Sequence, residues 1–175
     1  VGLPLTETMA IAAWLEARDE ERRISFPPLS READRMHQLM AFINTGFTGA
    51  FSPLWAVLEM EDADPVVQTT LRDFGHRVVI ERHDKLEGMI GQRPFLVGER
   101  PSLADAILVG VARWRDVHEV ADRERWPKLS ALRARLEGDP AVIHATRLEN
   151  GEPSPGTGAL LGHVPLAEVI ERFGR

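Results

Sequence analysis

The residues best suited to chemistry stand near the start of the chain, where Glu7 and Thr8 precede an apolar segment. Thr8 can serve as the N-cap of a helix over Met9–Ala17, because its hydroxyl can accept from a backbone N–H group of the first turn. A helix N-terminus has free N–H groups and the positive end of the helix dipole, so it can bind a carboxylate. Thr8 could add a hydroxyl donor to that carboxylate. The alternative is structural, with Thr8 as a simple N-cap and Glu7 as an exposed residue at the end of a strand.

The composition excludes several other chemistries. The 175-residue chain contains no cysteine, which rules out disulfides, thiolate metal sites and a cysteine nucleophile. Its six histidines lack the H-x-x-x-H and H-E-x-x-H spacings of helical metal sites. We therefore expect no metal. Sequences of the G-x-S-x-G, P-loop or G-x-G-x-x-G type are also absent, so hydrolase, NTPase and dinucleotide-binding functions have no support.

Charge and hydropathy limit the partners of the chain. The net charge is −6, and the arginines are dispersed along the expected helices, which argues against a nucleic-acid partner. No apolar run approaches the ~20 residues that cross a bilayer. The chain also does not begin with a basic region followed by an apolar one. We therefore expect no membrane partner and a cytoplasmic location.

The central element of the chain is an apolar helix that follows Gly98-Glu99-Arg100-Pro101. Ser102 can serve as its N-cap, and Asp105 follows three residues later, where its carboxylate can accept from the Ser102 backbone N–H group. This pair predicts a capping box. Helical spacing places one apolar face on Leu103, Ile107, Gly110, Trp114 and Val117. A helix with so much apolar surface is expected in a core.

Helical periodicity also dominates the rest of the chain. A long apolar stripe predicts a helix that begins at the N-cap Ser30 and kinks or breaks near Pro53. A second long helix is expected from the N-cap Asp64 to a stop at Gly91, and shorter ones after Trp126-Pro127 and Asp139-Pro140. The expected buried side of the second long helix is Val67, Leu71, Phe74, Val78, Leu86 and Met89. Only the first seven residues and Phe95–Val97 look extended, so the predicted fold class is mainly α.

Three strings in this chain resemble the glutathione S-transferase family. G-E-R-P-S-L-A-D, over Gly98–Asp105, resembles the G-x-x-x-S-[LI]-A-D of the buried central helix in the family's helical domain. L-T-E-T-x-A-I-A-x-W-L-E, over Leu5–Glu16, resembles the family's L-T-E-S-x-A-I-x-x-Y-L-E. The segment Phe42–Trp55 resembles bacterial beta-class members, especially in its F-S-P-L-[FW] ending. The later W-P-x-L and D-P-A-V strings stand in the family's order.

This resemblance implies an all-α glutathione-transferase C-terminal helical bundle, preceded by a remnant (the last strand and helix) of a thioredoxin-like α/β domain. The expected boundaries are 1–18 for the remnant of the thioredoxin-like glutathione-binding domain, 19–29 for a linker, 30–150 for the helical domain, and 151–175 for a Gly/Pro-rich tail with a short helix. Most of the thioredoxin-like half has no counterpart in this sequence. The family's thiol-activating Tyr, Ser or Cys belongs to that half. This chain has no tyrosine or cysteine, and its first serine is Ser25.

The resemblance also implies a function. The complete protein would be a glutathione S-transferase that conjugates the glutathione thiolate to small electrophiles, or performs related thiol chemistry, as a homodimer. Glutathione would be the co-substrate, with its γ-glutamyl end held by Glu7 and Thr8. The electrophile pocket would consist of Phe47, Phe51, Arg113 and Trp114, although aromatic residues at helical spacing are more often core residues. Beta-class enzymes tend to carry a His-Lys pair where this chain has Thr48-Gly49, so the glutathione contacts of that pair are not expected.

A second hypothesis is a non-catalytic glutathione-transferase-like interaction module, as in the gamma subunit of translation elongation factor 1 and in some tRNA synthetases. An enzyme of this family needs a residue that makes the glutathione thiolate available, and no residue of this chain takes that role. A helical adaptor could function without it. The sequence thus leaves the enzymatic status open and favours a transferase for the complete protein. Tight glutathione binding would count against the adaptor.

Overall fold

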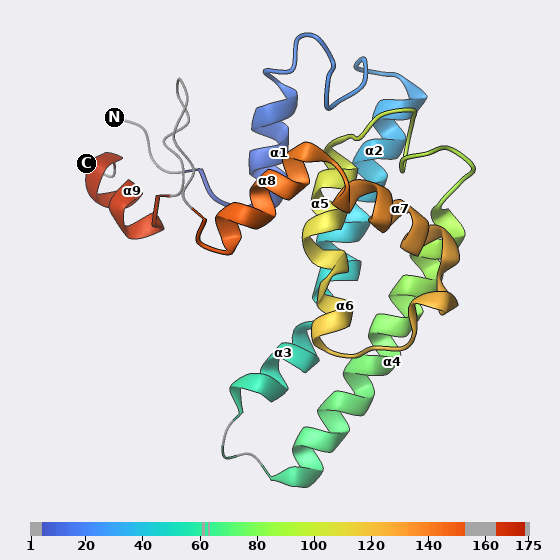
Figure 1. Cartoon of the computed structure of the whole chain (residues 1–175), viewed down its shortest axis with the longest axis vertical. Coiled ribbons are helices and arrows are strands. Elements are labelled where there is room, and N and C mark those ends of the chain that lie inside the picture. The colour runs from blue at the N-terminus through green and yellow to red at the C-terminus, as the bar shows by residue number, and fades with distance from the viewer. Residues whose placement is uncertain (1–4, 61, 63, 153–163, 174–175) are drawn as a thin grey trace.

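The computed structural model describes residues 5–60, 62, 64–152 and 164–173 (Figure 1). In chain order its elements are α1 (Thr8–Glu16), α2 (Arg31–Ala41), the π-helix η1 (Phe42–Phe47), α3 (Ser52–Glu59), α4 (Pro65–Met89), α5 (Leu103–Ala112), α6 (Trp114–Val117), the 3₁₀ helix η2 (Arg123–Arg125), α7 (Pro127–Glu137), α8 (Pro140–Glu149) and α9 (Leu166–Phe173). No strand occurs within the described ranges, which confirms the mainly helical fold class. The expected strand falls partly on residues 1–4, outside those ranges, so the thioredoxin-like remnant stays a prediction.

Short polar side chains begin the predicted helices. Ser30 accepts a hydrogen bond from the Ala33 N–H group at 3.1 Å. Asp64 accepts from Val66 at 2.7 Å, and Asp139 accepts from Ala141 at 2.8 Å. A proline follows each of the two aspartates, where its missing N–H group costs nothing and its fixed φ suits a helix. The sequence-based starts of α2, α4 and α8 are therefore confirmed.

The long helix that begins at Ser30 is interrupted, as the sequence predicts. After α2 the chain passes into η1, and Thr48 donates its hydroxyl to the Ile43 carbonyl at 2.8 Å. That spacing of five residues matches the wider turn of a π-helix. α3 then starts at Ser52, with Pro53 in its first turn.

α3 and α4 pack as a hairpin that projects from the bundle at the bottom of Figure 1. A Cβ atom at Gly75 of α4 would lie 2.6 Å from the Leu54 side chain of α3, so only glycine permits this approach. The predicted buried side of α4 is partly wrong, because Val67 and Phe74 are 46% and 44% exposed. The buried residues are Gly75, Val79, His83 and Leu86. α3 covers the Gly75 side of α4 and leaves the opposite side of its first half uncovered.

α5 lies at the centre of the bundle and packs against α2, η1 and α7. Its buried side is Leu103, Ala104, Asp105, Leu108 and Ala112. The predicted apolar face is wrong at two positions, because Gly110 is exposed and Val117 is 59% exposed. The helix ends at Ala112, and the short α6 follows after Arg113.

The loop before α5 is bent rather than extended at Phe95–Val97, which corrects the sequence-based expectation. The Leu96 N–H group donates to the Asp105 carboxylate at 3.0 Å, and Phe95 donates to the Gly98 carbonyl at 3.3 Å. These bonds turn the loop back onto the start of α5. The 19–29 segment is held there too, since the Leu103 N–H group donates to the Ile24 carbonyl at 2.9 Å.

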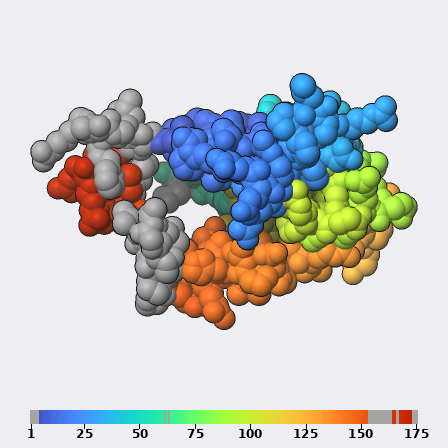
Figure 2. All heavy atoms as spheres, turned by 90° about the horizontal axis from the view of Figure 1, so that it is seen from above, coloured from blue at the N-terminus to red at the C-terminus, as the bar shows by residue number. Residues whose placement is uncertain are grey.

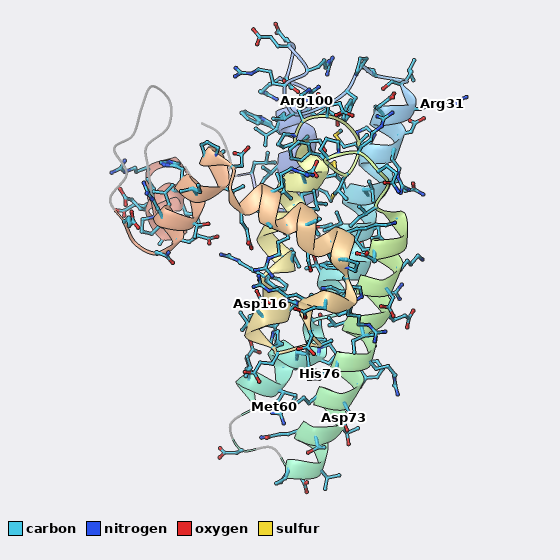
Figure 3. All side chains as sticks on the ribbon, turned by 45° about the vertical axis from the view of Figure 1, so that its right-hand side comes forward. Arg31, Met60, Asp73, His76, Arg100 and Asp116 are labelled. Atoms are coloured by element: carbon cyan, nitrogen blue, oxygen red, sulfur yellow. The ribbon has the colours of Figure 1, made fainter. Side chains whose placement is uncertain are left out.

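The two ends of the bundle are well separated. Arg31 and Arg100 lie at one end, Met60 and Asp73 at the other, and Asp116 between them (Figure 3). The expected helix in the C-terminal tail is present as α9, to the side of the bundle in Figure 1. Residues 153–163 of the predicted tail, including His163, lie outside the described residues.

Candidate functional site

The N-terminus of α1 is open. Thr8 is the first residue of the helix and Glu7 holds the N-cap position, so the prediction of Thr8 as N-cap is wrong by one residue. No side chain of the described chain caps this end. The first bonded N–H group is that of Ile11, which donates to the Glu7 carbonyl at 2.9 Å. The N–H groups of Thr8, Met9 and Ala10 are therefore left for an external acceptor, as expected at an uncapped helix start.

Glu7 has an unfavourable backbone conformation. Its φ is 70° and its ψ is 119°. A residue with a Cβ atom adopts a positive φ only rarely, and then mostly in the left-handed helical region, where Glu7 does not lie. Such conformations cost of order 1–3 kcal/mol and concentrate at binding and active sites. Both Glu7 and Thr8 are exposed. A strained, exposed and uncapped helix start is consistent with a binding site for an anionic group.

The rest of α1 is fixed to the bundle. Ala12 is 3% exposed, and near the other end of α1 the Glu16 carboxylate meets the His37 ring of α2 at 2.8 Å. The outer side of α1 carries apolar side chains, since Ile11 and Trp14 are 40% and 47% exposed. α1 therefore holds its open N-terminus in a fixed position beside an uncovered apolar surface.

A groove of about 720 Å³ runs between α5 and α8, within the ~300–1,000 Å³ range of small-molecule sites. Val109 and Gly110 of α5 and Val142 of α8 contribute to its apolar lining. Arg113 lies at the groove and donates to the Glu149 carboxylate at 3.0 Å. Figure 2 looks onto this end of the molecule, with α8 in orange opposite α1 and the 19–29 segment in blue.

The aromatic residues expected in the electrophile pocket belong to one cluster, but most of it is core. Phe47 and Phe51 are 0% exposed, so they offer no surface to a ligand, and the pocket assignment does not fit them. Phe51 packs edge-to-face on Trp114 at 5.6 Å between ring centroids, and Trp114 packs on Trp55 at 5.3 Å. Of the four predicted pocket residues, only the half-buried Trp114 and the exposed Arg113 keep accessible surface.

The predicted capping box at the start of α5 is present. The Asp105 carboxylate accepts from the Ser102 N–H group at 2.9 Å, from the Ser102 hydroxyl at 2.7 Å and from the Leu96 N–H group at 3.0 Å. Burial raises the pKa of Asp105 above its ordinary value, even though these hydrogen bonds act in the opposite direction. With every oxygen of this carboxylate occupied by the protein's own donors, this helix start is structural.

One buried titratable residue was not singled out from the sequence. His83 of α4 is 1% exposed and lies between the rings of Phe47 and Trp126, at centroid distances of 4.4 and 4.6 Å. Burial, with a smaller contribution from the positive charge of Arg115, lowers the pKa of His83 to about 4, against the hydrogen bond to Val79 and the charge of Asp84, which raise it. Its position on a helix face with Val79 and Leu86 was the available signal.

Two features are absent from the described part of the chain. No group of three or more His, Asp or Glu side chains there could hold a metal ion. None of the helices there is long and apolar enough to cross a membrane.

Comparison with known proteins identifies the helical domain. Residues 78–140 match the family model described as glutathione S-transferase, C-terminal domain. A glutathione transferase from Methylococcus capsulatus strain Bath matches with 28% identity and a TM-score of 0.69, over 83% of this chain and 68% of that one. No protein in the curated set matched the sequence.

Two sphingomonad structures show the same fold at lower identity. A sphingomonad glutathione S-transferase, solved in complex with glutathione, is 22% identical and has a TM-score of 0.69, over 83% of this chain and 68% of that one. The beta-class enzyme of Sphingomonas chungbukensis is 21% identical with the same TM-score and coverage. Residues 78–140 thus match the C-terminal domain of the glutathione S-transferase family, and the fold of the chain is similar to that of bacterial glutathione transferases.

Proposed function

We propose that this chain belongs to a glutathione transferase that conjugates the glutathione sulfur to small electrophiles and so detoxifies them in the cytoplasm. The observation that carries the proposal is the open N-terminus of α1, where Glu7 is strained and exposed and the N–H groups that follow have no partner among the described residues. Its support is the helical domain of this family on the same chain and a structural neighbour that was solved with glutathione.

The chemistry of the γ-glutamyl end of glutathione suits this helix start. Its carboxylate would accept from the N–H groups of Thr8 and Met9 and from the Thr8 hydroxyl, at the positive end of the helix dipole. Its ammonium group would donate to the Glu7 carboxylate. A γ-glutamyl group thus matches both charges of the site, whereas a simple carboxylate would match only one.

The electrophile would lie against the accessible part of the predicted pocket, which is Trp114 and Arg113. The groove beside Arg113 is apolar along Val109 and Gly110, so we expect apolar electrophiles with weak discrimination among them, because apolar walls distinguish similar ligands poorly. In the reaction the thiol of glutathione loses its proton, its sulfur bonds to the electrophilic carbon, and the leaving group departs with the bonding electrons. The thiol-activating donor is not among the residues of this chain.

We also propose a homodimer. The α3–α4 hairpin has apolar side chains on its uncovered side, with Leu58, Val66 and Val67 at 60%, 72% and 46% exposed. A contiguous patch of exposed apolar side chains is typical of a protein interface, and in this proposal the hairpin residues form one. Analytical ultracentrifugation should give a dimer for the wild-type chain and a monomer for Val66→Asp. A monomeric wild-type chain at micromolar concentration would contradict the proposal.

The test of the proposed function is calorimetric titration of the full chain with glutathione and with the dipeptide Cys-Gly, which lacks the γ-glutamyl group. We expect saturable binding of glutathione only. Thr8→Ala should weaken it by roughly 10- to 150-fold, because one hydrogen bond to a charged group contributes ~1.5–3 kcal/mol. Thr6→Ala, two residues earlier and also exposed, is the matched control and should bind as the wild type does.

Two results would count against this assignment. Equal binding of glutathione and Cys-Gly would show that the site does not recognise the γ-glutamyl group. No saturable glutathione binding would favour the non-catalytic interaction module. The rate of reaction of glutathione with an activated aryl halide, measured with and without the chain, then separates binding from catalysis.

A further inference from the structure

A small cavity lies between α4, α6, η2 and α7, on residues other than Glu7 and Thr8, and it shares Arg133 and Glu137 with the lining of the groove between α5 and α8. Its volume is about 30 Å³, and a single water needs ~10–15 Å³, so it has room for a ligand of one or two heavy atoms. His83 and the arginines Arg115, Arg123 and Arg133 are among its lining residues, together with Glu137. The cavity is therefore polar and rich in positive charge.

His83 has one ring nitrogen without a partner at this cavity. Its Nδ1 lies 2.8 Å from the Val79 carbonyl oxygen. A carbonyl can only accept, so Nδ1 holds the proton of the neutral ring and Nε2 has the lone pair. Within the described chain Nε2 is buried and has no hydrogen-bond partner. Buried polar atoms of this kind normally have one, so a ligand in the cavity is the expected partner.

The charges around the cavity do not balance. Arg115 is 7% exposed, and within the described chain its guanidinium donates only to Asp116. Asp116, labelled in Figure 3, also pairs with Arg123 and Arg133, each at 2.7 Å. Hydrogen bonds from Arg133 and Arg115 outweigh burial and hold the pKa of Asp116 below its ordinary value, so it is ionised. Glu137 pairs with Arg133 and is the second carboxylate of the cluster, whereas Asp84 pairs with Arg125, so three arginines face two carboxylates at the cavity.

We propose that this cavity binds a small monovalent anion, of about the size of chloride, together with a proton on His83. While the imidazole is neutral, the lone pair of Nε2 repels an anion and a water molecule can donate to it. When Nε2 is protonated, its N–H group and the Arg115 guanidinium both face the cavity as donors. A proton and an anion then enter together, so the net charge at the cavity does not change.

Burial fixes the sign of the pH dependence of His83, and the charged groups around the ring contribute less. They are Asp84 on α4, Arg115 and Asp116 on α6, Arg123 on η2, and Arg133 and Glu137 on α7. The pKa of His83 is about 4 in the fold against 6.5 for an unperturbed histidine. The unfolded chain therefore binds more protons in this window, and stability falls as the pH falls through it. An anion that binds only with the proton raises the pKa of His83 and offsets part of that loss.

The test uses the full chain in sodium chloride and in sodium gluconate at equal ionic strength, because gluconate is too large for the cavity. With chloride at about ten times its dissociation constant, the folded-to-unfolded ratio near pH 4 should rise about tenfold over that in gluconate. By the same linkage, the NMR titration midpoint of the His83 ring should rise by about one pH unit. At neutral pH the two salts should give equal stability.

Two variants and a control locate the effect. His83→Phe keeps an aromatic ring between Phe47 and Trp126 but removes Nε2, and Arg115→Met removes the buried guanidinium. The difference between chloride and gluconate should vanish in both. Arg135→Met changes an exposed arginine outside the cavity and should keep it. If Arg115→Met does not fold, the His83→Phe comparison and the ring titration still decide. Equal effects of the two salts on the wild type, or a chloride effect that persists in His83→Phe, would overturn the proposal.

Discussion

Two helix starts in this protein have the same backbone donors and treat them in opposite ways. At the start of α5 the Asp105 carboxylate, 0% exposed, accepts from the N–H groups of Ser102 and Leu96 and from the Ser102 hydroxyl. At the start of α1 no side chain of the described residues caps the helix, and Glu7 is strained and exposed. The first start is complete without a ligand, whereas the second leaves donors for one.

The difference distinguishes a helix start that stabilises the fold from a helix start that can bind a ligand. A buried helix end must satisfy its own N–H groups, because water cannot reach them and each one left alone costs ~1–3 kcal/mol. An exposed end can leave them to solvent at little cost, and solvent can be displaced by a ligand. Substitution of Asp105 should therefore lower the stability of the fold and leave the affinity for glutathione nearly unchanged. Substitution of Thr8 should lower the affinity and leave the stability nearly unchanged.

The largest expected effect is that of Asp105→Ala. It leaves the N–H groups of Leu96 and Ser102 without acceptors in the core, which should lower the free energy of unfolding by about 3–5 kcal/mol. That is a large share of the ~5–15 kcal/mol of a typical domain. Urea unfolding followed by circular dichroism measures it. Asp105→Asn keeps one acceptor oxygen and should lose clearly less. If Asp105→Ala lowers the free energy of unfolding by less than about 1 kcal/mol, the buried start of α5 does not depend on the hydrogen bonds of this side chain.

A matched pair of hydroxyl deletions sharpens the comparison. Ser102→Ala removes an N-cap side chain from a buried helix end and should cost about 1–2 kcal/mol. Thr8→Ala removes a hydroxyl from the exposed first turn of α1 and should stay within about 0.5 kcal/mol of the wild type, as exposed substitutions usually do. Both values come from the same urea titrations. Equal losses in the two variants would remove the distinction between a structural and a binding helix start.

Relief of the strain at Glu7 should separate stability from binding. Glycine adopts positive φ without a steric penalty, so Glu7→Gly should raise the free energy of unfolding by about 1 kcal/mol while glutathione binding weakens. Glu7→Gln keeps the strain and removes only the charge, so it should weaken binding without the gain in stability. If Glu7→Gly destabilises the chain, the φ of 70° is not a source of strain.

Local features of the fold could be predicted from the sequence, whereas burial on long helices could not. Ser30, Asp64 and Asp139 each cap the helix that follows them, because a cap depends only on a few neighbouring residues. The buried side of α4 depends instead on which helix covers it. α3 covers the Gly75 side, so Phe74 is exposed although it fits the apolar stripe.

The candidate site was predictable in part for the same reason. The strings around Glu7 and Ser102 predicted the start of α5 at its residue and the start of α1 to within one residue, and they carried the family resemblance. The left-handed φ of Glu7 had no signal, because a residue with a Cβ atom ordinarily has a negative φ. The burial of Phe47 and Phe51 and the cavity at His83 depend on contacts between residues far apart in the sequence, which periodicity alone cannot supply.

A second aspartate gives the smallest but most specific prediction. Asp19 accepts from the N–H groups of Arg23, Ile24 and Ser25 and from the Ser25 hydroxyl. Burial raises the pKa of Asp19, but these hydrogen bonds outweigh it and lower the value to about 2. Asp105 accepts from similar donors and has its pKa raised, because it lies deeper.

The two aspartates should therefore give pH dependences of opposite sign. The contribution of Asp19 to stability is complete above 3.8, its pKa in the unfolded chain, and is lost as the pH falls through about 2. Asp105 contributes most below 3.8 and less as the pH rises through its raised pKa. In thermal unfolding between about pH 2 and 4, Asp19→Asn should flatten the acid side of the profile, because the native state no longer has a carboxylate there to protonate. An unchanged slope in Asp19→Asn would show that the Asp19 carboxylate does not hold the 19–29 segment. Burial would then no longer explain why the two aspartates give pH dependences of opposite sign.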